Sequence, residues 1–321
     1  MNPMSRSLPI SVVIATHQRH KDLSETLLLL REREQVAEII VVDNASTDGT
    51  SELIRKEFPE VSLIDLRENM GVPAFGVGVE AARQPFIFLL DDDAVPEPGT
   101  LHRAVVALQH DPWISVIACH IIDTFGQPVT DQWPPHPLLF WGCGACLRRE
   151  TIVGLPYFFD PKLFLHGTEM DLAIRLYAKG TWIKYLPDAV VRHRYSPNGR
   201  SEAIRIYFLV HSAMRFALKH LPLKYALPAC MRHLLVLLIK ALNENCVGAY
   251  LLGLVSASKQ INELLRTRQP VSRKIARIYY DQVWEYEPLA RRIAQALTGR
   301  PLSRREKPLP GFPSYLTETN Q

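Results

Sequence analysis

Short apolar runs alternate with amphipathic segments through the first 120 residues of this chain. The runs that predict strands are residues 10–16, 38–44, 61–66, 86–90 and 114–119, and the segments between them have the spacing of helices. A repeated strand-then-helix order builds a parallel sheet with helices on both faces, through right-handed crossovers. The sequence therefore predicts an α/β, Rossmann-like fold with a mostly parallel sheet.

The rest of the first part of the chain is less regular. Residues 123–137 are polar and rich in proline, which predicts a surface loop. A glycine-rich strand is expected over residues 140–149, a helix over 169–180 and short strands over 182–187 and 189–194. We expect residues 1–199 to form one domain.

Beyond residue 199 the pattern becomes helical. Three long helical segments are predicted at 201–222, 225–245 and 247–268. Pro228, Arg232 and Lys240 interrupt the second, which falls short of the roughly 20 apolar residues that span a bilayer. We expect residues 200–300 to form a helical, basic region and residues 301–321 a disordered tail.

The net charge of +4 is unevenly distributed. Residues 1–199 carry 18 basic and 25 acidic side chains, and residues 200–321 carry 19 and 8. The acidic part suits a metal site. The basic part suits an anionic partner such as a membrane surface, although a solvated helical surface packed on the sheet domain explains the same residues. No nucleic-acid partner is expected.

The cysteines and the start of the chain predict a compartment. Five cysteines, without a repeating framework, fit a reducing environment. Cys143 and Cys146 form a lone CxxC, for which zinc is not expected. The first apolar stretch is too short for a secretory signal. We expect a cytoplasmic protein, with contact between the basic helices and the inner face of the membrane left open.

Three aspartates, Asp91, Asp92 and Asp93, directly follow the apolar run at 86–90. Two unit charges about 4 Å apart repel by roughly 4 kcal/mol at an effective dielectric near 20, so a positive partner is expected. Ligands of open α/β sheets bind at the carboxyl ends of strands, and carboxylates prefer Mg²⁺ or Mn²⁺. A solvated acidic turn is the alternative. Asp43 ends an earlier strand, either to contact a nucleotide or to bond its own backbone.

Several motifs together carry a resemblance to a family. They are "SVVIATHQR", "IIVVDNASTDGT", "ENMGV", "FIFLLDDDAVPEPGTL", "GCGACLRR", "FLHGTEMDLAIRL" and "AVVRHR". In this order and spacing, over roughly residues 8–220, the chain resembles the family 2 inverting glycosyltransferases of the GT-A type, in particular bacterial rhamnosyltransferase-like members.

The resemblance implies a metal-dependent transferase. It would move a sugar from a UDP- or dTDP-linked donor to a saccharide or lipid-linked acceptor, in cell-surface polysaccharide synthesis. Carried over by motif, the nucleotide-sugar contacts are Ala15, Thr16, Asp43, Asn69, Asp91 and Asp92, and the ligands of Mn²⁺ or Mg²⁺ are Asp93 and His193. A structural histidine is the alternative for His193.

The same resemblance implies a catalytic base in "HGTEMDL". The first acid of the family's usual pair is replaced by Thr168, which leaves Glu169 as the expected base and Asp171 as its competitor. Asp171 could instead hold the start of its helix. Trp141, Gly142 and Gly144 are expected on a strand beneath the acceptor, with a core role open for Trp141.

Two other functions were weighed. Gly76, Gly78 and Ala81 satisfy the GxGxxG/A pattern of an NAD(P)-binding oxidoreductase, but that fingerprint should directly follow the first strand, and this one follows the third after about nine residues. The altered acidic pair also allows a catalytically idle nucleotide-sugar-binding module, although Glu169 still supplies a usable carboxylate.

Overall fold

The structure is a computed structural model. It describes residues 7–281 except 34, 131–135 and 196–200, together with the isolated residues 293 and 297. The predicted tail at 301–321 lies outside the described residues.

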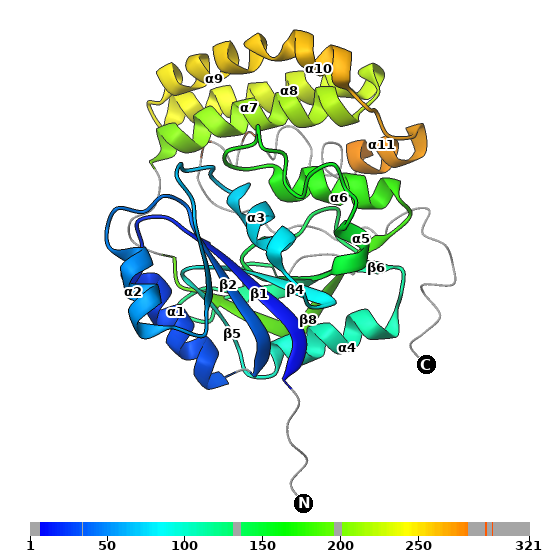
Figure 1. Ribbon diagram of the computed structural model, residues 1–321. Coiled ribbons are helices and arrows are strands. Elements are labelled where there is room, and N and C mark those ends of the chain that lie inside the picture. The colour runs from blue at the N-terminus through cyan, green and yellow to red at the C-terminus, as the bar shows by residue number, and fades with distance from the viewer. Residues whose placement is uncertain are drawn as a thin grey trace, which may run out of the picture.

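A single eight-stranded sheet forms the centre of the first part of the chain (Figure 1). Its strands are β1 (Leu8–Thr16), β2 (Val36–Asp43), β3 (Ser62–Asp65), β4 (Phe86–Asp91), β5 (Ala94–Pro96), β6 (Ile114–Ile122), β7 (Ala145–Arg148) and β8 (Trp182–His193). Their order is β3-β2-β1-β4-β7-β6-β8-β5. The predicted α/β fold is confirmed, but the sheet is mixed. β7 runs antiparallel to β4 and β6, and β5 runs antiparallel to β8.

Helices cover both faces of this sheet, as the alternating pattern predicts. They are α1 (His20–Arg33), α2 (Thr50–Glu57), α3 (Ala74–Ala81), α4 (Thr100–His110), α5 (Arg149–Ile152) and α6 (Thr168–Ala178). Along β1, Val13 packs into the core that contains α3 and α6, whereas Val12 and Ile14 pack into the core that contains α1, α2 and α4. Both faces of the strand are buried, which explains its unbroken apolar sequence.

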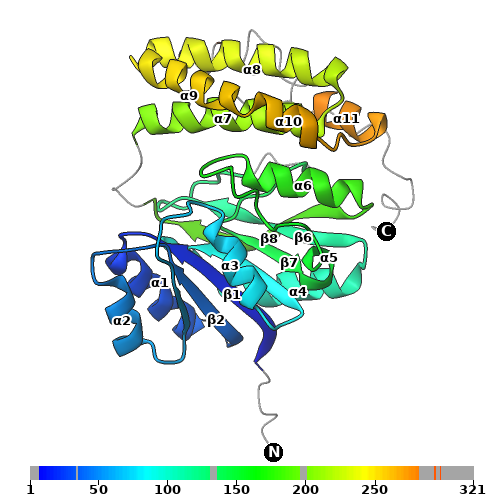
Figure 2. The same cartoon turned by 45° about the horizontal axis from the view of Figure 1, so that its top comes forward.

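The second part of the chain is helical, as expected. Its elements are α7 (Glu202–His220), α8 (Leu223–Asn243), α9 (Val247–Lys259), α10 (Ile261–Thr267) and α11 (Arg273–Tyr279). The expected segment 247–268 thus divides at Gln260 into α9 and α10. These helices form a layer beside the sheet domain, and α7 is the helix of that layer nearest to it (Figure 2).

The glycines of the GxGxxG/A pattern lie inside α3 rather than in a strand-to-helix turn. A side chain at Gly78 would meet Val13 at 2.4 Å and Val42 at 3.0 Å, so this glycine allows α3 to pack closely on the sheet. A dinucleotide fingerprint needs its glycines in the turn that binds the pyrophosphate. The arrangement does not fit the oxidoreductase alternative.

Two expected strands differ in extent. β7 begins only at Ala145, so Trp141, Gly142 and Gly144 lie in the turn before it, where the Gly144 N–H donates to the Trp141 carbonyl at 3.2 Å. The expectation that these three residues lie on a strand is therefore wrong. The two short strands expected near the end of the sheet domain are one continuous strand, β8.

Candidate functional site

The ends of three strands meet at one edge of the sheet. In the register of the parallel strands, Thr16 pairs with Asp43 and Ala15 pairs with Asp91. Ala15, Thr16, Asp43 and the aspartate trio are therefore neighbours, and for Asp43 and Asp91 this agrees with the strand ends predicted from the sequence.

Asp91 and Asp93 turn toward His193, which ends β8. The His193 Nε2 lies 2.9 Å from a carboxylate oxygen of Asp93 and 3.8 Å from one of Asp91. One ligand atom from each of the three residues lies within 4.8 Å of the others. Two carboxylates and one imidazole form a donor set that suits Mn²⁺ or Mg²⁺.

Asp92 points elsewhere, although it lies between the other two in sequence. Its carboxylate accepts hydrogen bonds from the Thr16 hydroxyl at 2.8 Å and from Arg19 at 2.9 Å, and its backbone carbonyl accepts one from Thr26. Arg19 also reaches Asp93 at 3.1 Å. Part of the positive charge that the trio requires thus comes from the protein. The sequence reasoning missed Arg19; its place just after the first strand was the available signal.

Crowding of the carboxylates changes their protonation. Burial among protein atoms raises the pKa of Asp91 to about 7, although 37% of its side chain is exposed, and it raises the pKa of Asp92 to about 6. Burial alone would lower the pKa of His193, but the hydrogen bond to Asp93 and the charges of Asp93 and Asp91 outweigh it and raise that pKa. These pKa shifts show that the carboxylate charges are unfavourable in this place. A bound divalent cation would stabilise them, so the residues fit such an ion.

Glu169 lies in the first turn of α6 and faces the same site. The Thr168 hydroxyl donates a hydrogen bond to its carboxylate at 2.8 Å, and the Gly142 backbone N–H is a second donor. Burial raises the pKa of Glu169, and its charge contributes to raising the pKa of Asp91. The turn before α6 has two left-handed residues, His166 with φ 66° and Gly167 with φ 79°.

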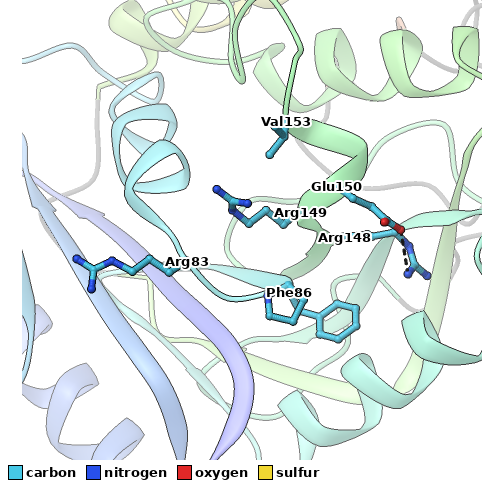
Figure 3. Close-up of a pocket in the computed structure, with 7 residues that line it drawn as sticks. Arg83, Phe86, Arg148, Arg149, Glu150 and Val153 are labelled. Atoms are coloured by element: carbon cyan, nitrogen blue, oxygen red, sulfur yellow. Dashed lines mark ion pairs between the residues drawn. The ribbon is translucent and has the colours of Figure 1, made fainter.

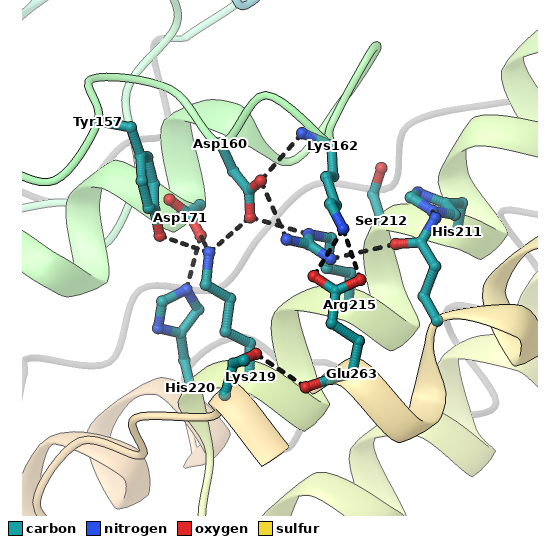
Figure 4. Close-up of polar contacts among 12 residues, drawn as sticks. Tyr157, Asp160, Lys162, Asp171, His211, Ser212, Arg215, Lys219, His220 and Glu263 are labelled. Carbon is teal, nitrogen blue, oxygen red and sulfur yellow. Dashed lines mark hydrogen bonds and ion pairs between the residues drawn. The ribbon is translucent and has the colours of Figure 1, made fainter. Parts of the chain in front are cut away.

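Asp171 makes a different set of contacts (Figure 4). Its side chain is 1% exposed, with Arg175 at 2.8 Å on one oxygen and His220 at 2.6 Å and Lys219 at 3.3 Å on the other. Burial would raise its pKa, but the His220 hydrogen bond and these charges lower it strongly. Both oxygens are bound by side chains, and Lys219 and His220 lie on α7, so Asp171 is placed to join α6 to α7 rather than to act as a base.

The same buried network continues through Asp160, in the loop before α6. Arg215 of α7 binds both oxygens of Asp160, at 2.8 and 3.1 Å, and Lys219 binds Asp160 as well as Asp171. The hydroxyl of Ser212, on α7, lies 3.0 Å from the His166 carbonyl and 3.1 Å from the Leu165 carbonyl, and its single proton is shared between these acceptors and the Phe208 carbonyl of α7 at 2.7 Å. The turn that carries Glu169 is therefore held by α7.

The residues expected on the nucleotide side are engaged within the protein. Asp43 is fully buried and accepts from the Ser46 N–H at 3.0 Å and the Ser51 hydroxyl at 2.6 Å. These contacts match the second role that the sequence allows for Asp43, that of a turn aspartate bonded to its own loop. The Asn69 side chain accepts from the Gly71 N–H at 2.8 Å.

Two further residues at this edge were missed from the sequence. Asn44 fixes the loop that contains Asn69, because its amide donates to the Gly71 carbonyl at 3.0 Å and accepts from the Met70 N–H at 2.7 Å. The Tyr195 ring packs on His193, with 4.0 Å between ring centroids.

That loop is also joined to the segment that leads to Glu169. The Val72 N–H donates to the Phe164 carbonyl at 2.9 Å, and a side chain at Gly71, which has φ 68°, would approach that carbonyl oxygen to 2.1 Å. Only glycine fits there. The two loops thus meet along their backbones.

The three residues of the glycine-rich turn lie at different depths. A side chain at Gly142 would come within 3.4 Å of the Glu169 carboxylate, whereas one at Gly144 would meet Ile121 at 2.8 Å. Trp141 is half-buried and packs against the core on the α1 side of the sheet. Gly142 is therefore beside the expected base, and Gly144 serves packing.

A hollow lined by arginines lies at the opposite end of β4 (Figure 3). Two of its three arginines donate hydrogen bonds to backbone carbonyls. Arg149 donates to the Ala82 carbonyl at 2.8 Å, and Arg148 donates to the carbonyls of Asp111 and Ile114. Since Phe86 begins β4 and Asp91 ends it, this hollow is separate from the acidic cluster.

Comparisons with known proteins give a consistent result. Residues 11–162 match the model of the family described as Glycosyl transferase family 2. Poly-beta-1,6-N-acetyl-D-glucosamine synthase of Staphylococcus aureus (strain COL) is 27% identical over 244 residues, which cover 65% of this chain and 59% of that protein. The chain thus spans about three fifths of the length of that relative. N-acetylglucosaminyl-diphospho-decaprenol L-rhamnosyltransferase of Mycobacterium tuberculosis is 24% identical over 248 residues, covering 62% of this chain and 80% of that protein.

Solved structures share the fold. TarS 1–349 of S. aureus superimposes with a TM-score of 0.55 at 16% identity, over 87% of this chain and 93% of that one. The mannosyltransferase PcManGT of Pyrobaculum calidifontis, in complex with GDP-Man and Mn²⁺, gives a TM-score of 0.53 at 18% identity, over 88% and 89%. The fold is that of GT-A glycosyltransferases, as predicted.

Proposed function

From the premise that residues 11–162 form a glycosyl transferase family 2 domain, we propose that this protein transfers a sugar from a nucleoside-diphosphate sugar to a hydroxyl of a saccharide or lipid-linked acceptor. The observation that carries the proposal is the convergence of Asp91, Asp93 and His193 with Glu169 at the carboxyl edge of the sheet. In open α/β sheets this edge is where ligands bind.

The donor half of the site is the acidic cluster. Asp91, Asp93 and His193 would hold Mn²⁺ or Mg²⁺ there, and His193 would present its Nε2 in the neutral form. The bound ion would neutralise the donor diphosphate and stabilise the charge that develops on the leaving group. Arg19 holds Asp92 and orients Asp93, so that this carboxylate stays directed at His193. The GDP-Man and Mn²⁺ bound by PcManGT support this assignment.

The acceptor half of the site is Glu169. Its carboxylate would remove the proton of the acceptor hydroxyl, whose oxygen forms a bond to the anomeric carbon. The bond from that carbon to the diphosphate oxygen breaks, and its electron pair leaves with the nucleoside diphosphate. Because burial raises the pKa of Glu169, the carboxylate is a stronger base than an exposed glutamate.

Two relatives support a proposal for the class of donor and acceptor. One is named for its product, poly-beta-1,6-N-acetyl-D-glucosamine, and the other for a diphospho-decaprenol-linked acceptor. Both names support a role for this chain in cell-surface polysaccharide synthesis. We propose a UDP- or dTDP-linked donor sugar for this chain.

A binding and turnover experiment tests the proposal. Calorimetry with UDP and dTDP, with and without Mn²⁺, should show metal-dependent binding that Asp93→Ala weakens by about tenfold or more. Asp188→Ala is the matched control, because Asp188 is an exposed aspartate on the same strand as His193. Nucleotide binding that ignores metal in the wild type would contradict the proposed site.

Glu169→Gln separates an enzyme from an idle binding module. This variant should bind nucleotide as the wild type does and lose donor-sugar hydrolysis or transfer by about a hundredfold or more. A wild-type rate in Glu169→Gln would show that the base is another residue. Absence of any hydrolysis or transfer in the wild type, with binding intact, would favour the idle module.

A further inference from the structure

Helix α8 has more apolar surface than the protein covers. Its 21 residues are long and apolar enough by composition to cross a membrane, which corrects the expectation drawn from Pro228, Arg232 and Lys240, and only 33% of its most apolar stretch, with a mean hydropathy of 1.5, is buried. One side packs on α7 and α9 through Leu237 and Ala241. A soluble helix with one buried face normally has a polar opposite face, and α8 does not.

The uncovered side of α8 is a regular stripe. Leu223, Leu227, Met231 and Leu235 follow one another at intervals of four residues, and all are exposed, with Met231 at 73%. Residues four apart lie on the same side of a helix. Lys224 is exposed beside this stripe, three residues before Leu227.

Helix α9 repeats the pattern. Leu251 and Val255 are exposed and four residues apart, and the next position in that row is the exposed Lys259. Leu252, also exposed, widens the stripe. Three residues connect α8 to α9, and both helices pack against α7, so they form a helical hairpin. Lys224 at the start of α8 and Lys259 at the end of α9 therefore both lie away from the connection between the two helices.

The charges around these stripes are mostly positive. Between residues 202 and 281 there are twelve lysine or arginine residues and four aspartate or glutamate residues, and two of the twelve, Arg215 and Lys219, belong to the buried network with Asp160 and Asp171. Of those four acids, Glu202 and Glu263 are already paired with lysines, Asp281 is paired with Arg277, and Glu244 lies at the opposite end of the hairpin from Lys224. Arg266 and Arg273, beyond Lys259, are exposed and add to the basic end.

We propose that the outer face of the α8–α9 hairpin, defined by Leu223, Leu227, Met231 and Leu235 of α8 and Leu251, Leu252 and Val255 of α9, binds the surface of an anionic lipid bilayer. An amphipathic hairpin lies in such an interface with its apolar side chains among the acyl chains and its lysines at the phosphate groups. Anionic headgroups attract each basic residue near the surface by about 1 kcal/mol. A second copy of the chain is the less suitable occupant, because two such faces would bring like charges together.

Vesicle co-sedimentation of the full chain tests this surface and needs neither donor nor acceptor. The wild type should bind vesicles of phosphatidylcholine and phosphatidylglycerol in equal parts, and should bind pure phosphatidylcholine several-fold more weakly. Raising the salt from about 0.1 M to about 0.5 M should weaken binding to the mixed vesicles. Equal binding to both vesicle types at both salt concentrations would overturn the anionic part of the proposal.

A charge-matched pair of variants locates the surface. Leu227→Glu/Met231→Glu should weaken binding to mixed vesicles by about tenfold or more, because two carboxylates would have to enter the interface. Val153→Glu/Phe125→Glu makes the same charge change at two exposed apolar residues of the sheet domain, and should bind as the wild type does.

Equal loss in both double variants would overturn the assignment of the face, as would no binding of the wild type at low salt. Light scattering of the wild type without vesicles tests whether a second copy of the chain covers this face instead. A dimer that Leu227→Glu/Met231→Glu converts to a monomer, together with absent vesicle binding, would assign the face to self-association and overturn the proposal. Metal-dependent nucleotide binding by the same wild-type sample shows that the transferase site is intact, whichever result the vesicles give.

Discussion

At the scale of single residues, the acidic edge is balanced by cations that the chain itself supplies. Arg19 and Asp92 are separated by 73 positions in sequence, so their ion pair could not be read from local pattern. The position of Asp91, by contrast, followed from an apolar run that stops at a strand end. What could be predicted was the need for positive charge, and what could not was that Arg19 meets part of it.

Replacing Arg19 should make the protein depend more on divalent metal. Arg19→Ala leaves Asp92 and Asp93 short of a counter-charge and should cost about 3 kcal/mol of unfolding free energy. Added Mn²⁺ should restore more stability to this variant than to the wild type, as measured by urea denaturation, and Arg19→Lys should behave as an intermediate. An identical Mn²⁺ effect in Arg19→Ala and the wild type would show that Arg19 does not balance the metal-binding cluster.

Metal binding should tighten with rising pH. The pKa of Asp91 is raised to about 7 and that of His193 is also raised, and the protonated form of neither residue can bind a metal ion. Mn²⁺ affinity should therefore rise with pH, by up to about tenfold per pH unit for each of the two protons that must leave, and level off once both groups are deprotonated. The stability of the metal-free protein should change in the opposite direction. Because the pKa of Asp91 is raised in the folded state, the free energy of unfolding should fall as the pH increases from about 4 to 7. Calorimetric titration at several pH values measures the affinity, and a flat profile would contradict the raised pKa.

At the scale of elements, the strand–helix alternation was predictable because period and length distinguish the two kinds of segment. β7 was not, since four residues within a glycine-rich stretch do not show where the strand begins or that it is antiparallel. Nor did the sequence show that α6 and α7 share buried ion pairs. Asp171 stood two residues from Glu169 and resembled a second candidate base, but its partners Lys219 and His220 lie 48 and 49 positions away.

Breaking the α6–α7 contact should reduce stability. Asp171→Asn leaves Arg175, Lys219 and His220 with less counter-charge in a buried place, and should cost about 3 to 5 kcal/mol of unfolding free energy. Glu263→Gln is the control, because its ion pair with Lys162 is solvent-exposed and should contribute little. Urea denaturation compares the two. Equal midpoints for both variants would mean that the buried network does not stabilise the fold.

At the scale of the whole molecule, the sheet domain and the helical layer are joined rather than merely adjacent. The predicted boundary between residues 199 and 200 was drawn from the change in sequence pattern. However, Ser212, Arg215 and Lys219 of α7 hold the loop and the helix that carry Glu169. The sequence pattern distinguishes the two parts of the chain by their composition. It does not show which buried charged residues of one part pair with those of the other.

A fragment ending at residue 199 should therefore fail as an independent domain. It would leave Asp160 and Asp171 buried without their α7 cations and would expose apolar surface of α6 that the layer covers. We expect no cooperative thermal transition for residues 1–199 by circular dichroism, whereas the full chain should show one. A cooperative transition in the fragment would show that the network is dispensable for folding.

The close contact of Gly71 with the Phe164 carbonyl limits how this scaffold could be re-engineered. A replacement for the loop that contains Asn69 and Gly71 would have to bring a glycine at that position. Any other residue there would displace the segment that contains Phe164, and this segment leads to Glu169. Exchanges of substrate preference should thus succeed as paired transplants of both segments and fail as single ones.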